Sequence, residues 1–237
     1  MAPLMKAIGQ RFRKLHPSVE IEIETGGSGK GIQDARHGRC DIGMSSRGLR
    51  SDERDLTGFA LARDGVCLIV HASNPITSLS KLQVADVFTG KVSNWMEVGG
   101  RNEPIHALNR FPSRSEVELF CQFFKVPERD GFKASATLGD NDKTIQAVVE
   151  DVRAITYVSL GEAEREARNG KTIKLLRLNG VKASHANVRN GNFAFSRPLI
   201  LVTRDLPTGT GKAFVEFAMS PQVIDVIEEY NFIPYLD

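Results

Sequence analysis

The chain has 237 residues, of which 41% are hydrophobic and 25% charged, and its formal net charge is +2. This length and composition provide a core for one large domain or for two smaller lobes. The weak net charge argues against nucleic acid or an anionic membrane as a partner, and no apolar run predicts insertion into a membrane. No signal-peptide pattern is visible, so the targeting segment of an exported protein would lie outside this chain.

Apolar periodicity predicts an alternation of helices and strands along most of the chain. The predicted helices are residues 3–15, 30–37, 81–88, 114–124, 143–150, 162–168, 210–219 and 221–229. The predicted strands are residues 19–24, 41–44, 59–61, 66–70, 105–108, 154–158, 173–178 and 198–203. This alternation is typical of an α/β protein with largely parallel sheets. Loop residues beside apolar strands indicate the crossings between lobes, so we expect 1–73 and 194–237 to form lobe 1 and 74–193 to form lobe 2.

The stretch from Thr25 to Leu49 carries the clearest indication of a binding site. A glycine-serine loop leads into a helix, and a short strand then ends in a second loop that contains Ser45 and Ser46. Helix N-termini present unpaired N–H groups and a partial positive charge, and anions settle there. Backbone and hydroxyl donors from two such element ends therefore predict the capture of a small oxyanion.

The sequence gives no indication of a metal site, a cofactor or a catalytic apparatus. The histidines and cysteines lack metal-ligand or redox spacing, and no nucleophile elbow, P-loop or zinc-protease motif is present. We expect Cys40, Cys67 and Cys121 to be small buried hydrophobic residues. A bridge between Cys40 and Cys67 is an open alternative.

Six stretches, which follow one another in the family's order, resemble the phosphate-binding protein of bacterial phosphate ABC importers. They are A-P-L-M-K-A (2–7), G-G-S-G-K-G-I (26–32), D-I-G-M-S-S-R (41–47), V-A-D-V-F-T-G-K-V-S-N-W (84–95), A-I-T-Y-V-S-L-G (154–161) and S-R-P-L-I-L-V-T (196–203). The resemblance covers nearly the whole chain. It implies a two-lobe fold of the type II periplasmic binding-protein class. It also implies a periplasmic or other extracytoplasmic protein that passes phosphate or a similar tetrahedral oxyanion to an ABC permease.

The resemblance also implies that donors from both lobes clamp the anion. The implied contacts are Ser28, Gly29, Ser45, Ser46, Arg110, Ser113, Arg114 and Ser115. Glu116 follows directly and would repel an anion if it pointed inward, or would complement the helix dipole if it did not. Arg47 has two open roles, anion binding and a surface salt bridge.

Two departures from the family pattern affect what we expect. Ser46 stands where many relatives carry an aspartate, which can accept the proton of phosphate and repel sulfate, so we expect weaker selectivity for phosphate over sulfate here. The family also begins with a strand and a G-S-T-like loop before the counterpart of Met1. The first strand of lobe 1 is therefore missing from the expected fold, and we expect weakened ligand binding.

Two other functions stay open at this point. One is a sensor domain that binds the same anion and reports to a signalling partner. The other is a phosphate-ester hydrolase that uses Ser28, for which no nearby base can be named.

Overall fold

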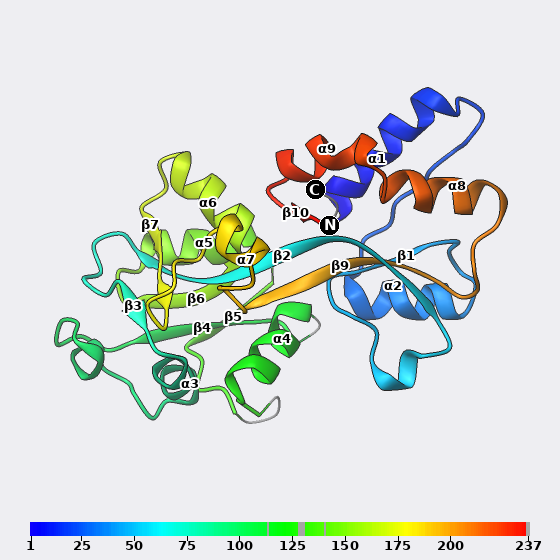
Figure 1. Ribbon diagram of the computed structural model, residues 1–237. Helices are drawn as coiled ribbons and strands as arrows, with labels where there is room; N and C mark the ends of the chain where they lie inside the picture. Colours follow the sequence, from blue (N-terminus) through cyan, green and yellow to red (C-terminus); the bar gives the residue numbers. More distant parts are fainter. Residues whose placement is uncertain (113, 128–130, 140, 236–237) are drawn as a thin grey trace. The chain divides into compact units, whose positions relative to one another are not determined.

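The computed structural model describes residues 1–112, 114–127, 131–139 and 141–235 (Figure 1). The chain divides into two compact units: unit 1 is Met1–Asp64 with Arg197–Asp237, and unit 2 is Gly65–Ser196. Strand β2 (Thr57–His71) contributes its first half to unit 1 and its second half to unit 2.

Unit 1 is a sheet with helices on both faces. Its helices are α1 (Ala2–Leu15), α2 (Gly27–Arg36), α8 (Gly209–Ala218) and α9 (Ile224–Glu229), with short 3₁₀-helices η1 (Ser51–Glu53) and η3 (Pro221–Val223). Its strands, besides the first half of β2, are β1 (Gly43–Ser45), β9 (Ser196–Thr203) and β10 (Ile233–Pro234). Strand β9 lies between β1 and β2, β1 pairs antiparallel with β9, and β10 pairs antiparallel with β2.

The side chains of β9 alternate between the two faces of the unit 1 sheet, as the period of a strand requires. Leu199 and Leu201 pack in the cluster that α1, α8 and α9 build on one face. Ile200 and Val202 pack with α2 residues such as Ile32 on the other face. Helix α2 is thereby held against the sheet beside β1.

Unit 2 is a second α/β layer structure. Its helices are α3 (Lys81–Thr89), α4 (Ser115–Phe124), α5 (Asn141–Glu150), α6 (Leu160–Arg168) and α7 (His185–Arg189), with the 3₁₀-helix η2 (Trp95–Val98). Its strands, besides the second half of β2, are β3 (Ser78–Leu79), β4 (His106–Arg110), β5 (Ala136–Leu138), β6 (Ala154–Ser159), β7 (Ile173–Leu175) and β8 (Arg177–Leu178). The strand order is β2-β6-β4-β5, β7 also pairs with β2, and β3 pairs with β8.

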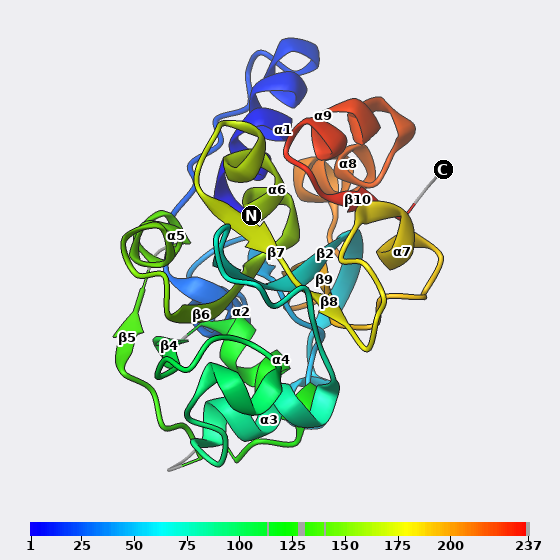
Figure 2. The same ribbon diagram turned by 90° about the vertical axis from the view of Figure 1, so that its left-hand side faces the viewer.

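Strands β4, β5 and β6 position Arg110 and the starts of three helices of unit 2. Strand β4 runs parallel to β5 on one side and to β6 on the other. Each is followed by a helix, so α4, α5 and α6 begin at the same edge of the sheet. Helices α3 and α4 lie on one side of β4, and α5 and α6 on the other (Figure 1 and Figure 2). Aromatic rings fill the α3–α4 side, where Phe120 stacks on Tyr157 at a centroid distance of 4.5 Å.

The α/β class is confirmed, but the expectation of largely parallel sheets is wrong. β2 pairs antiparallel with β6, β7 and β10, and β1 pairs antiparallel with β9. Apolar periodicity gives a strand's faces but not its direction, and the direction depends on how the chain passes between the units. The expected break between 59–61 and 66–70 is also wrong, since β2 is continuous. Gly65 does not mark a turn within β2. It leaves room for neighbouring side chains, because an added Cβ would lie 2.8 Å from Leu160 and 3.0 Å from Val188.

The predicted strand at 19–24 is also wrong, because these residues pair with no strand in the part of the chain that the structure describes. The alternating apolar side chains nevertheless pack against the core of unit 1. Ile21 and Ile23 are half-buried in the cluster of α1, and Ile21 packs closely on Gly9. A second correction concerns α2, which begins at Gly27 rather than near Lys30 and so takes Ser28 and Gly29 into its first turn.

Candidate anion-binding site

The N-terminus of α2 is suited to an anion by its backbone and by its sequence. Gly26 precedes the helix, and Gly27 has φ of +83°, a left-handed conformation that favours glycine. The first turn contains no acidic residue, and among the described residues no side chain caps it. By contrast, α3 is closed by a capping box between Ser80 and Gln83. The positive end of the α2 dipole and its first N–H groups are therefore available to a ligand.

Ser28 and Ser46 lie side by side. The backbone N–H of Ser46 donates to the Ser28 hydroxyl oxygen at 2.9 Å. This approach depends on glycines in both elements: an added Cβ at Gly31 would lie 2.4 Å from the Met44 carbonyl oxygen, and one at Gly43 would lie 2.2 Å from that of Gly31. The close packing of α2 on β1 thus brings the two serine-containing segments of unit 1 together.

The loop after β1 is held by a buried ion pair. Both terminal nitrogens of Arg47 donate to the Glu53 carboxylate at 2.7 Å, and the Arg50 N–H donates to it at 2.8 Å. Hydrogen bonds from Arg47 hold the pKa of Glu53 below its ordinary value, against the effect of burial. Of the two roles open for Arg47, the structure shows an ion pair, and it is largely buried. Ser45 supports the same turn, because its hydroxyl donates to the Arg47 carbonyl oxygen at 2.9 Å.

Arg110 is the last residue of β4 in unit 2, and it is fully buried. Its Nη2 donates to the carbonyl oxygen of Gly139 at 2.8 Å. The parallel pairing of β4 and β5 makes this contact possible, since Arg110 is opposite Leu138 and the Phe111 N–H donates to the Leu138 carbonyl oxygen at 3.0 Å. The guanidinium is thus oriented by the residue that follows β5.

The main chain of Arg110 is fixed by a second, buried set of hydrogen bonds. The Asn109 side-chain oxygen accepts the Arg110 N–H at 2.8 Å and the Tyr157 hydroxyl at 2.6 Å. Burial raises the pKa of Tyr157 well above its ordinary range, with nearby Cys121 adding to the increase. The phenol therefore stays protonated and continues to donate.

The remaining predicted contacts of unit 2 lie at the start of α4. Ser113 falls outside the described residues. Arg114 is the N-cap residue of α4 and Ser115 its first residue, so both lie near the end of β4 that carries Arg110. Glu116 is buried in the same first turn.

Several residues that shape this edge of unit 2 were not among the contacts predicted from the sequence: Asn109, Gly139, Asn141, Tyr157 and Glu162. Asn141, the first residue of α5, donates from Nδ2 to the Glu162 carboxylate in the first turn of α6. Burial raises the pKa of Glu162 and Asp142 adds to the increase, while Asn141 and Arg165 oppose it. In the sequence, the glycine and polar residues between the 136–138 strand and the following helix could have indicated that a structured turn lies here.

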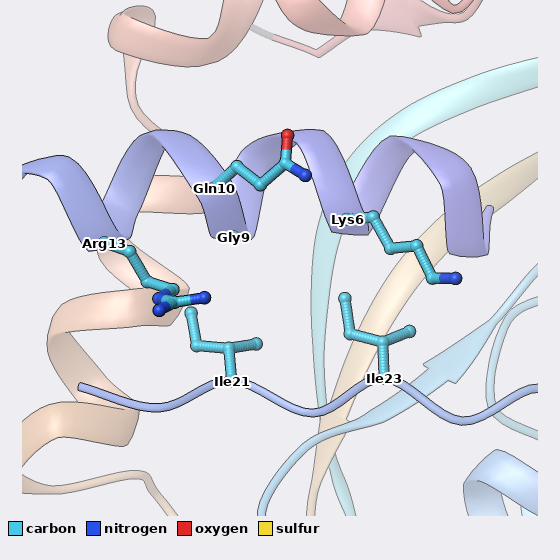
Figure 3. A pocket seen from close by; sticks show the side chains of 6 residues that line it. All are labelled: Lys6, Gly9, Gln10, Arg13, Ile21 and Ile23. Atoms are coloured by element: carbon cyan, nitrogen blue, oxygen red, sulfur yellow. The ribbon is translucent and has the colours of Figure 1, made fainter.

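A groove of about 230 Å³ lies elsewhere in unit 1, between α1 and the extended segment after it (Figure 3). Lys6 and Arg13 extend from α1 towards Ile21 and Ile23, which line the opposite side. None of the predicted anion contacts lines this groove, so we do not place the anion there.

Cysteine, metal and membrane features add nothing to the site. Cys40, Cys67 and Cys121 are all free thiols, so the alternative of a Cys40–Cys67 bridge is wrong. Across the described residues, no group of three or more His, Cys, Asp or Glu side chains could hold a metal ion. The helices of the described ranges are too short or too polar to cross a membrane.

These features together are those of an α/β solute-binding protein. Residues 1–222 match the family model for the PBP superfamily domain, and the chain belongs to this superfamily. The chain is similar to a substrate-binding protein assigned to phosphate ABC transport in Clostridium perfringens, solved with bound phosphate. The TM-score is 0.88 at 30% identity, over 98% of this chain and 95% of that chain.

Two further relatives agree with this assignment. An ABC-type phosphate transport receptor from Vibrio cholerae aligns with a TM-score of 0.86 at 25% identity, over 98% of this chain and 95% of that one. The phosphate-binding protein PstS of Bacillus subtilis (strain 168) is 26% identical, over the full length of this chain and 78% of its own. The relatives are binding proteins of transport systems rather than enzymes, in agreement with the sequence prediction.

Proposed function

We propose that this chain is an extracytoplasmic solute-binding protein that captures inorganic phosphate and passes it to an ABC permease. The observation that carries the proposal is the hydrogen bond from the Ser46 N–H to the Ser28 hydroxyl. It joins the open N-terminus of α2 to the loop after β1, and so gathers hydroxyl and backbone donors around one point. The relatives are named as proteins that bind or transport phosphate, and these names support phosphate as the anion.

Unit 1 and unit 2 act as the two lobes in this proposal. The anion first docks on unit 1 through Ser28, the N–H of Gly29, and Ser46. The second lobe then contributes the donors that the family resemblance implies for it, which are Arg110, Ser113, Arg114 and Ser115. Closure follows from the higher affinity of the anion for the closed state. Neutral donors and an arginine can hold a dehydrated dianion by charge-assisted hydrogen bonds without a metal.

Ser46 sets the selectivity that we propose. Phosphate near neutral pH carries a proton, whereas sulfate does not, and a carboxylate at position 46 would favour the former and repel the latter. A serine hydroxyl can accept that proton weakly but does not repel sulfate. The chain therefore prefers phosphate less strongly than relatives that carry an aspartate.

Calorimetric titration with phosphate, sulfate, arsenate and molybdate tests the proposed function. We expect saturable binding of one phosphate per chain, arsenate binding of similar strength, and sulfate competition at moderate excess. Tight binding of a different anion with no response to phosphate would overturn phosphate as the ligand. Steady turnover of a chromogenic phosphate ester would instead indicate a hydrolase.

A further inference from the structure

The starts of α5 and α6 are tied together by one side-chain contact in unit 2. Asn141 Nδ2 donates to Oε2 of Glu162. The Asn141 Oδ1 is inaccessible to solvent and has no hydrogen-bond partner among the described residues, so Glu162 is what anchors this amide. The second carboxylate oxygen of Glu162 lies 3.5 Å from Arg165, and the Asp142 carboxyl is beside it.

The topology places this contact around the end of β4. Strand β4 lies between β5 and β6, and both neighbours run parallel to it. Helix α5 follows β5 and helix α6 follows β6, so the Asn141–Glu162 contact joins the two helices that flank the end of β4. Arg110 is the residue at that end.

The same contact also lies close in the chain to the group that orients Arg110. Gly139, whose carbonyl oxygen accepts from Arg110 Nη2 at 2.8 Å, is only two residues before Asn141. A shift of the first turn of α5 would move this carbonyl. Arginine recognises oxyanions through a planar fork of donors, and small errors in its direction weaken binding.

We propose that Asn141 and Glu162 are a positioning pair that keeps the Arg110 guanidinium in its binding orientation by fixing the segment after β5. The inference rests on the proposed function, because it concerns how strongly the chain holds phosphate. Neither residue touches the anion; they act through Gly139. Glutamine at position 162 keeps the acceptor for Asn141 and adds a donor for Asp142, whereas alanine removes the contact.

Calorimetric titration with inorganic phosphate tests the pair in the whole chain. Glu162→Ala should weaken phosphate binding by about tenfold, a typical size for coupled neighbours, and Glu162→Gln should restore wild-type affinity. Glu164→Ala is the matched control, since Glu164 lies on the same helix and pairs instead with His185 at 2.9 Å. It should leave the affinity unchanged.

The same substitution in an Arg110→Lys chain separates a positioning role of Glu162 from a general structural effect. Lysine at position 110 keeps the charge but lacks the guanidinium fork, so in an Arg110→Lys chain the further change Glu162→Ala should add less than a twofold loss. An equal loss in both backgrounds, or wild-type affinity of a folded Glu162→Ala chain, would overturn the positioning role.

The guanidinium N–H resonances of Arg110 provide a readout that does not depend on phosphate. In the ligand-free chain, Glu162→Ala should shift or broaden them, and Glu162→Gln should return them to the wild-type positions. Unchanged resonances in Glu162→Ala would overturn the inference. If the wild-type chain fails to bind phosphate while these resonances respond as expected, the proposed function fails and the positioning of Arg110 stands.

Discussion

The backbone N–H of Ser46 donates a 2.9 Å hydrogen bond to the hydroxyl of Ser28. The two residues belong to different elements, the loop after β1 and the first turn of α2. Because the Ser28 oxygen accepts this bond, its own hydrogen is directed to another acceptor, and a bound oxyanion is such an acceptor. The bond therefore both builds the cradle and orients the donor that we propose for the ligand.

Replacement of Ser28 by alanine should remove both contributions. We expect phosphate affinity to fall by roughly tenfold or more, because a buried donor to a charged ligand is lost. The free energy of unfolding should fall by about 1 kcal/mol, since the Ser46 N–H loses its partner. Calorimetry and denaturant unfolding measure the two effects. Ser18→Ala, at an exposed serine of the same unit, is the control, and equal behaviour of the two variants would remove Ser28 from the site.

Arg110→Ala should abolish most of the affinity for phosphate. A fully buried guanidinium supplies charge-assisted, directional hydrogen bonds, so we expect a loss on the order of 100-fold or more. Arg101→Ala is the matched control, because Arg101 is an exposed arginine of the same unit. A folded Arg110→Ala chain that binds phosphate like the wild type would show that this arginine serves unit 2 only as a structural residue.

Ser46→Asp should sharpen the discrimination between phosphate and sulfate. The introduced carboxylate can accept the proton of hydrogen phosphate and repels the fully ionised sulfate. A competition titration of phosphate binding in increasing sulfate should give strong inhibition of the wild type and weak inhibition of Ser46→Asp. If phosphate binding by the wild type is already undiminished in large sulfate excess, Ser46 does not limit selectivity.

The Arg47–Glu53 pair predicts a pH dependence of stability. The pKa of Glu53 is held below its ordinary value of 4.5, so its contribution is present above that pH and is lost as the pH falls through the lowered value. At neutral pH, Glu53→Gln should lower the free energy of unfolding by about 3 kcal/mol, because it removes the carboxylate charge that pairs with the largely buried Arg47.

Denaturant unfolding between pH 7 and pH 3 checks this dependence. The difference between wild type and Glu53→Gln should be largest near neutral pH and should shrink as the pH falls below 4.5, because the carboxylate becomes neutral first in the unfolded chain and then, at its lowered pKa, in the folded chain. Glu20→Gln, at an exposed position, should change little. A difference that stays constant over the whole pH range would contradict the assigned ion pair.

Much of the fold could be predicted from local patterns. Helix α3 was predicted almost to the residue, and the structure shows that both of its ends are set locally: Ser80 starts it with a capping box and Gly90 ends it in a left-handed conformation. The strand at 19–24 failed for the opposite reason. Its apolar alternation is real, but a strand also needs a hydrogen-bonding partner, and periodicity within one segment cannot supply that.

The candidate site, like the fold, could be predicted from the sequence only in part. Ser28 and Ser46 lie in short glycine-containing segments, and their chemistry is visible in the sequence. The partners of Arg47 and Arg110 are not, since one is a glutamate beyond an intervening turn and the other is the backbone carbonyl of Gly139, directly after the neighbouring strand. Contacts of this kind depend on strand register, which the sequence alone leaves open.

The central claim is that donors of both units hold the same phosphate, and a titration followed by amide NMR tests it most directly. The amide resonances of Gly29 and Ser46 in unit 1, and of Arg114 and Ser115 in unit 2, should shift along one common isotherm with a single Kd. Shifts confined to one unit, or two isotherms with different affinities, would contradict the account.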